Sequence, residues 1–189
     1  SVTEIAGHAF DGCTSLYDVT IPASVSLIVI YAFYGTPWRD AALDENGFLV
    51  INNVLYESAN DDAVVNIPNT VTRIADEVFA QKQIEQISIP EGVLQIGERS
   101  FYQCLNLKEI SLPDSLTSIQ YGAFYFSQNL SSVNIPESVT SIEGRAFYNT
   151  ALKEITVPRS VTSIGEQALG YIAVEDGKEG FVAEPVEEF

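Results

Sequence analysis

Hydrophobic positions along this chain recur in a fixed order with a period of 22 or 23 residues, apart from one interval of 46. Three landmarks show the period. The first is a proline that follows Ile, Leu or Val, and the second is an isoleucine within an element close to V-T-x-I. The third is a large apolar residue, usually Phe, five residues after that isoleucine. The prolines are Pro22, Pro68, Pro90, Pro113, Pro136 and Pro158; the isoleucines are Ile5, Ile28, Ile74, Ile96, Ile119, Ile142 and Ile164; the third position reads Phe10, Phe33, Phe79, Phe101, Phe124, Phe147 and Leu169. A period of this length predicts a solenoid in which each repeat forms one turn.

The segment Leu107–Asn129 illustrates one predicted turn. Ile110 and Leu112 alternate with polar residues, which is the period of a β-strand with one buried face. Pro113 follows and has no N–H for a sheet ladder, so the chain leaves the sheet there. A tight turn or a short helical piece then carries Phe124 into the core. Because each turn can cover its apolar residues only with its neighbours, we predict stacked turns, a parallel sheet and an internal ladder of phenylalanines.

The predicted organisation is a single, mainly β solenoid of about seven to eight turns over residues 1–189. Residues 35–62 lack the landmarks of one turn and form an irregular insert, in which two apolar runs joined by Asn52-Asn53 predict a β-hairpin. Residues 172–189 leave the period and are strongly acidic, which indicates a cap or a tail. The chain begins inside a repeat and contains no Met, so we expect a fragment of a longer protein.

These motifs resemble the BspA-like leucine-rich repeats of bacterial surface proteins, whose repeat reads approximately L-x-x-I-x-I-P-x-x-V-T-x-I-G-x-x-A-F-x-x-C. The chain contains L-K-E-I-S-L-P-D-S-L-T-S-I and L-K-E-I-T-V-P-R-S-V-T-S-I-G-E-Q-A-L, and the resemblance covers about residues 1–171. It implies a right-handed leucine-rich repeat solenoid with a parallel sheet on its concave face and short helical turns. It also implies a secreted or cell-surface protein that adheres to or binds proteins or glycans, and it brings no catalytic residues.

Composition argues against several classes of function. The formal net charge of −17 disfavours binding to nucleic acid, whose phosphates require Lys and Arg, and no run approaches the ~20 apolar residues of a membrane-spanning helix. His8 is the only histidine, so the chain has almost no residues from which to build a metal cluster or the base of a nucleophile–base pair. We therefore predict no enzyme, no catalytic residues, no metal, no cofactor, and no membrane insertion by this segment.

The two cysteines occupy equivalent positions in their repeats. Cys13 and Cys104 each lie three residues after the core phenylalanine. Stacked strands are roughly 4.8 Å apart, so the four turns between these cysteines exceed the Cα separation of about 7 Å that a disulfide tolerates. We predict two free, buried thiols that pack as small hydrophobic side chains.

The outward residues of the predicted concave strands form two columns. The first column is Asp18, Val64, Gln86, Glu109, Ser132 and Glu154, and the second is Thr20, Asn66, Ser88, Ser111, Asn134 and Thr156. The second column contains only short uncharged polar side chains, which either form a hydrogen-bonding surface for a ligand or simply suit a crowded sheet. Because solenoids bind through extended concave surfaces, we expect a ligand here.

Aromatic residues supply further candidates. Tyr102, Tyr125 and Tyr148 each follow a core phenylalanine, and they either form a platform for a sugar or seal the turn with the hydroxyl in water. Trp38 and Arg39 in the insert could anchor a protein partner, or Trp38 could pin the insert onto the solenoid. We predict a non-enzymatic extracellular or cell-surface module that binds a protein. The alternative is a module for polysaccharide or host glycan, for example in a cellulosome-like assembly.

Overall fold

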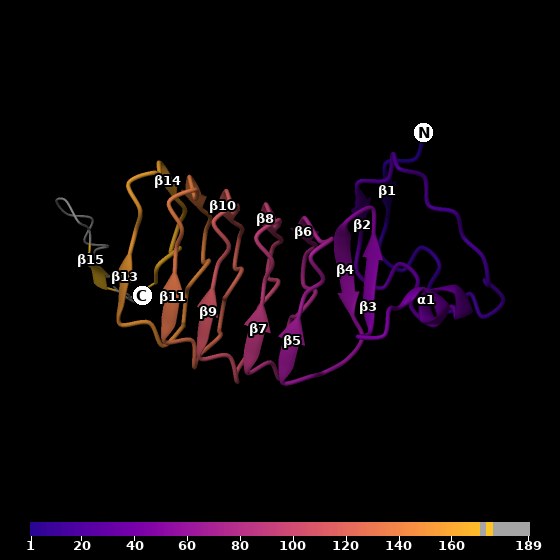
Figure 1. Cartoon of the computed structure of the whole chain (residues 1–189), viewed down its shortest axis with the longest axis horizontal. Helices are drawn as coiled ribbons and strands as arrows, with labels where there is room; N and C mark the ends of the chain where they lie inside the picture. Colours follow the sequence, from indigo (N-terminus) through magenta and orange to yellow (C-terminus); the bar gives the residue numbers. More distant parts are fainter. Residues whose placement is uncertain (171–172, 176–189) are drawn as a thin grey trace, which may run out of the picture.

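The computed structural model describes residues 1–170 and 173–175, and it is a mainly β solenoid of about 7 turns with almost no helix. The turns stack along one axis, with two rows of strands along opposite edges (Figure 1). One row contains the three-residue strands β5 (Val64–Asn66), β7 (Gln86–Ser88), β9 (Glu109–Ser111), β11 (Ser132–Asn134), β13 (Glu154–Thr156) and β15 (Ala173–Glu175). The two-residue strands are β1 (Glu4–Ile5), β2 (Leu27–Ile28), β6 (Arg73–Ile74), β8 (Gln95–Ile96), β10 (Ser118–Ile119), β12 (Ser141–Ile142) and β14 (Ser163–Ile164).

The two rows differ in how their strands pair. The two-residue strands come from the V-T-x-I elements, and five of them (β6, β8, β10, β12 and β14) belong to a seven-stranded sheet in the order β14-β12-β10-β8-β6-β4-β3. The other two members of this sheet, β3 (Phe48–Ile51) and β4 (Val54–Ser58), come from the insert, while β1 and β2 pair only with each other. The three-residue strands pair two by two instead, as β5–β7, β9–β11 and β13–β15. All of these three-residue pairs are parallel and in the register of the repeat. The parallel arrangement is therefore as predicted, but hydrogen bonding along the three-residue row is interrupted between the pairs.

Each repeating proline also begins a turn. The carbonyl oxygen of the proline accepts a hydrogen bond from the backbone N–H three residues later, as in Pro113 to Leu116 at 3.0 Å. The same bond recurs at Pro22, Pro68, Pro90, Pro136 and Pro158. Proline suits this place because it cannot extend the ladder while its carbonyl remains an acceptor.

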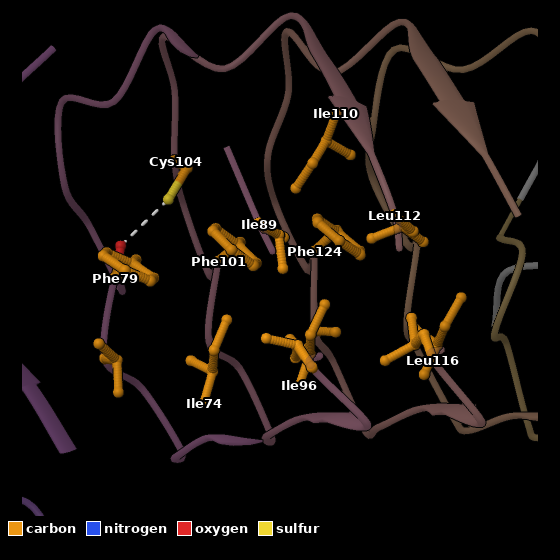
Figure 2. Packing of buried hydrophobic residues seen from close by; sticks show 14 of the residues in the cluster. Ile74, Phe79, Ile89, Ile96, Phe101, Cys104, Ile110, Leu112, Leu116 and Phe124 are labelled. Atoms are coloured by element: carbon orange, nitrogen blue, oxygen red, sulfur yellow. Dashed lines mark hydrogen bonds between the residues drawn. The ribbon is translucent and has the colours of Figure 1, made fainter. Parts of the chain in front are cut away.

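The core follows the predicted ladder of aromatic rings. Phe79, Phe101, Phe124 and Phe147 are fully buried, and neighbouring rings lie 5.2–5.3 Å apart and nearly parallel. Figure 2 shows Phe79, Phe101 and Phe124 in a row across the view, with Ile74 and Ile96 of the two-residue strands in a parallel row below them. The rings enter the core from hydrogen-bonded turns. Within the described residues the one helix is α1 (Pro37–Ala42), which lies in the insert.

The insert restores part of the turn that the sequence period lacks. Strands β3 (Phe48–Ile51) and β4 (Val54–Ser58) form the predicted antiparallel hairpin, and Asn52 and Asn53 both have positive φ. Strand β4 then pairs in parallel with β6, which places the fully buried Leu55 opposite Ile74. Leu55 thus occupies the missing isoleucine position of the skipped repeat.

Two features of the first turn differ from the prediction. Residues 18–20 form no strand, because the segment in phase with them in the next repeat is helix α1, which offers no strand to pair with. Cys13 is exposed, whereas Cys104 is buried and both thiols are free. The prediction of a buried Cys13 is wrong because no earlier turn covers it.

At the other end of the solenoid, β15 pairs in parallel with β13. This strand adds one more member to the three-residue row at the start of the predicted acidic cap or tail. The rest of that segment, residues 176–189, and residues 171–172 lie outside the described part of the chain.

Candidate binding surfaces

The first candidate surface is the long-strand face, which we define as the outward residues of β5, β7, β9, β11 and β13. Its members are Val64, Asn66, Gln86, Ser88, Glu109, Ser111, Ser132, Asn134, Glu154 and Thr156, and all are exposed. The strand registers align them into columns, for example Glu109 opposite Ser132 and Ser111 opposite Asn134. The structure therefore brings ten of the twelve predicted column residues together. Asp18 and Thr20 are exposed but lie in the first turn without a strand.

The long-strand face is hollowed where neighbouring strands do not pair. A recess of about 450 Å³ lies at the break between β7 and β9, and its lining includes Gln86, Lys108 and Glu109. A second recess, of about 470 Å³, lies at the break between β11 and β13. The two-by-two pairing thus produces grooves that cross a face which the sequence alone predicts to be an unbroken sheet.

The recess between β11 and β13, which we call the acidic groove, is lined by acidic residues. Asp114, Glu137 and Glu154 contribute to its lining, together with Ser132, Asn134 and Thr156, and no Lys or Arg does. The neighbouring turns therefore concentrate negative charge around polar hydroxyl and amide groups. Such a groove is complementary to a cationic side chain.

The predicted tyrosine column is a stacked row. Tyr102 and Tyr125 have ring centroids 5.7 Å apart and nearly parallel planes, and Tyr125 and Tyr148 are also 5.7 Å apart but tilted by 50°. All three residues are half-buried. The facing sides of the Tyr102 and Tyr125 rings are covered within the row, and all three residues are half-buried, which favours the sealing role over a sugar platform.

Trp38 and Arg39 hold the insert against the solenoid. The indole ring of Trp38 lies 4.5 Å from that of Phe33 and packs against the core, partly buried. Arg39 pairs with Glu57 of β4, with Nε donating to Oε2 at 3.2 Å, and with Asp40 at 2.8 Å. Hydrogen bonding to Glu57 raises the pKa of the Arg39 guanidinium further above its usual range, against the opposing effect of burial. Both side chains thus have structural partners within the chain.

Sequence reasoning missed a second candidate surface, the inter-turn cleft. This cleft lies between the second turn and the third, and Tyr31, Tyr34, Lys82, Arg99 and Tyr102 contribute to its lining. One sequence signal points to it: Ala80 follows Phe79 where the other complete repeats have tyrosine after phenylalanine. The small side chain and the skipped repeat together leave the space open.

Catalytic and metal chemistry have little support in the part of the chain that the structure describes. His8 is exposed, with its Nδ1 2.8 Å from an Asp11 carboxylate oxygen. Within residues 1–170 and 173–175 no three His, Cys, Asp or Glu side chains are grouped as metal ligands would be. Asp44 of the insert serves local structure, because its side chain accepts hydrogen bonds from the N–H groups of Asn46 and Phe48. No helix in the described residues has the length and apolar character needed to cross a membrane.

The chain is similar to several solved bacterial proteins. The pneumococcal vaccine antigen PcpA matches with a TM-score of 0.54 and 23% identity, over 94% of this chain and 36% of that one. A leucine rich cell surface protein from Faecalibacterium prausnitzii matches with a TM-score of 0.41 and 22% identity, over 72% and 54%. The leucine rich repeat protein of T. pallidum matches with a TM-score of 0.46 and 25% identity, over 87% and 63%. This chain thus spans less than two thirds of each of these proteins, and the likeness to PcpA supports the fold.

Sequence comparison identifies the repeat itself. A search of curated proteins found no match. The family model described as the BspA type leucine rich repeat region matches six copies, over residues 1–61 and 49–174. These ranges cover the whole solenoid, with the hairpin insert included. The chain belongs to the BspA-type leucine-rich repeat family.

Proposed function

We propose that this solenoid is a non-enzymatic module that binds a protein partner through the long-strand face. The observation that carries the proposal is the alignment of exposed residues into two columns, crossed by recesses at β7/β9 and β11/β13. Apolar residues of the same strands, such as Ile110 and Ile155, are buried. The scaffold residues therefore point inward and leave the outward columns free to vary with the ligand.

The acidic groove favours a partner with a basic surface. Asp114, Glu137 and Glu154 contribute to its lining, to which no Lys or Arg contributes, and the whole chain carries a formal charge of −17. A field of one sign steers an oppositely charged partner and raises its association rate. We infer that the groove receives a Lys or Arg side chain of the partner.

We propose a location outside the cell or at its surface, which the family supports. The BspA-like repeats that this chain resembles are typical of secreted and cell-surface proteins, with adhesion as a common role. A module that presents an exposed polar face and recesses suits recognition of an external protein. Adhesion through this face is therefore part of the proposal.

The experiment compares two charge-matched double variants. Glu137→Gln with Glu154→Gln removes two charges from the acidic groove, while Glu143→Gln with Glu166→Gln removes two beside the two-residue strands. Immobilised wild-type solenoid is used to isolate partners from extracellular extracts, and calorimetry then measures the affinity of a purified partner. We expect the groove variant to weaken binding about tenfold, which corresponds to about 1.4 kcal/mol, and the control to bind like wild type.

Two results would overturn the proposal. One is a partner whose affinity is the same for wild type and the groove variant. The other is a glycan array on which the solenoid binds polysaccharide while no protein partner is recovered, which would support the glycan alternative. A lower affinity with an unchanged salt dependence would contradict the electrostatic part of the argument, since screening weakens exposed charges.

A further inference from the structure

The inter-turn cleft lies where the hairpin replaces only part of a turn. Its volume is about 350 Å³, and a neighbouring recess of about 230 Å³ shares Ile28, Val29, Ile30, Glu77 and Arg99 with it. Together they form a groove between the second and third turns. None of its lining residues belongs to the long-strand face.

In regular parts of the solenoid, the backbone peptide groups beside the core phenylalanines form hydrogen bonds from one solenoid turn to the next. The N–H of Phe79 donates to the carbonyl of Ser100 at 2.9 Å, and the N–H of Phe101 donates to the carbonyl of Ala123 at 2.8 Å. The peptide unit between Ser100 and Phe101 thus accepts from the turn before it and donates to the turn after it. Such units form hydrogen-bonded rows that run along the solenoid.

This row stops at one wall of the cleft. The carbonyls of Ala32 and Tyr34 accept hydrogen bonds from the first turn at 2.7 and 2.9 Å. The N–H groups of the same peptide units, on Phe33 and Gly35, have no hydrogen-bond acceptor among the described residues. Phe33 and Tyr34 line the cleft, so this wall presents the main-chain donor of Phe33, with that of Gly35 directly after the lining residue Tyr34.

The opposite wall carries the complementary groups. The N–H groups of Phe79 and Gln81 donate to the fourth turn at 2.9 and 2.7 Å. The carbonyls of the same peptide units, on Val78 and Ala80, have no donor within the described part of the chain. This wall therefore presents main-chain acceptors across the cleft from the donors.

We propose that the cleft binds a short linear peptide segment of a partner protein, whose main chain completes the missing row of hydrogen bonds. A polypeptide carries a C=O and an N–H on each peptide unit, which matches donors on one wall and acceptors on the other. Buried main-chain polar groups in proteins are almost always paired. Addition of an extended peptide to an unpaired main-chain edge is a recurring mode of recognition.

The side chains of the cleft define the segment further. Lys82 forms no ion pair among the described residues, and Arg99 lies 4.0 Å from Glu77 at the edge of pairing distance. The rings of Tyr31 and Tyr34 are about half exposed, at 49% and 55%. The cleft is lined by Arg39, Lys82 and Arg99 and by Glu57 and Glu77, and Arg39 is already paired with Glu57. Lys82 is therefore the cation that an acidic side chain of the segment would pair with, and the exposed tyrosine rings favour an apolar side chain beside it.

The test uses a phage-displayed library of random linear heptapeptides, selected on the wild-type chain. Ala80→Tyr places in the cleft the residue that the repeats of Phe101, Phe124 and Phe147 carry natively at this position, so the variant should fold. We expect at least a tenfold loss of affinity for the selected peptides in Ala80→Tyr, and a clear loss in Lys82→Glu. Ser163→Tyr, at an exposed position of β14 outside both candidate surfaces, is the matched control and should bind like wild type.

Amide hydrogen exchange distinguishes main-chain pairing from other contacts. A synthetic copy of the best peptide should slow exchange at Phe33 and Gly35, because these N–H groups gain acceptors. Equal binding to Ala80→Tyr, no enriched peptide, or unchanged exchange at both amides would overturn the proposal. Dimerisation of the wild type that Ala80→Tyr abolishes would also overturn it, since a second copy would then occupy the cleft. The Glu137/Glu154 variant tests the long-strand face separately.

Discussion

At the residue scale, in four turns the position three residues after a core phenylalanine carries a small side chain that donates to a backbone carbonyl. Cys104 donates from Sγ to the carbonyl of Phe79 at 3.1 Å (Figure 2), and Ser127 donates to that of Phe101 at 2.6 Å. Thr36 and Thr150 make equivalent bonds within their own turns. Cys104 is thus one of several interchangeable donors as well as a small apolar side chain.

The two thiols should differ strongly in reactivity. Burial raises the pKa of the Cys104 thiol to about 12, whereas Cys13 is exposed. Because the thiolate is the reactive form, we expect the native protein at pH 8 to show one fast reaction with a disulfide reagent, at Cys13, and a second only after unfolding. Cys13→Ser should abolish the fast phase and leave the slow one, as measured by absorbance of the released thiol. Two equally fast phases would contradict the buried position of Cys104.

At the scale of elements, the hairpin shows how an insert can preserve a solenoid. Strand β4 joins the seven-stranded sheet beside β6, and the N–H of Ala75 donates to the carbonyl of Leu55 at 2.9 Å. The two-residue turn requires positive φ at Asn52 and Asn53, observed as 49° and 64°, and asparagine tolerates this region. Asn53 also donates from its side chain to the carbonyl of Thr70 at 2.7 Å. The turn therefore sets the hairpin register and anchors it to the next repeat.

Substitution at Asn52 tests the hairpin turn. Asn52→Ile places a β-branched residue at positive φ and should lower the free energy of unfolding by roughly 1–2 kcal/mol. Asn52→Gly removes that steric cost and should leave stability close to wild type or slightly higher. Urea unfolding monitored by circular dichroism measures both. Equal stability of the two variants would show that Asn52 does not adopt positive φ in the folded protein.

At the scale of the whole molecule, contacts run between neighbouring turns. Neighbouring turns are connected by the stacked phenylalanine rings, by the two-residue strands and by the peptide groups beside the phenylalanines. In such a solenoid, stability is approximately a sum over repeats and their interfaces. A complete internal repeat should therefore be removable without loss of the fold.

Deletion of Leu107–Asn129 tests this additivity, because it joins Asn106 to Leu130, the equivalent of Leu107 in the next repeat. We expect a shorter chain that still unfolds cooperatively, with a lower melting temperature by about 2–4 °C for each kcal/mol lost. Deletion of residues 107–117 shifts the phase of all later turns and should abolish the cooperative transition. Scanning calorimetry compares the two, and loss of cooperativity in the in-phase deletion would contradict the additive picture.

The local sequence predicted much of this molecule because the features concerned depend on neighbours along the chain. Alternation placed Ile110 inside and Glu109 outside, the proline marked the end of each strand, and Asn52-Asn53 predicted the hairpin. The long-strand columns from Val64 to Thr156 followed from the same alternation. The alternation and the proline repeat with the period, so several copies of the pattern support them, whereas the hairpin follows from the turn propensity of two asparagines.

The tertiary structure decided what depends on the turns above and below. Cys13 and Cys104 have the same local sequence position, yet only Cys104 is covered by an earlier turn. Residues 18–20 lack a strand because α1 occupies the next repeat, and the long strands pair two by two. The inter-turn cleft exists because the hairpin supplies the sheet strand of the missing repeat but leaves the N–H groups of Phe33 and Gly35 without partners among the described residues. A repeat sequence specifies the shape of one turn, whereas burial, pairing and open space are properties of the stack.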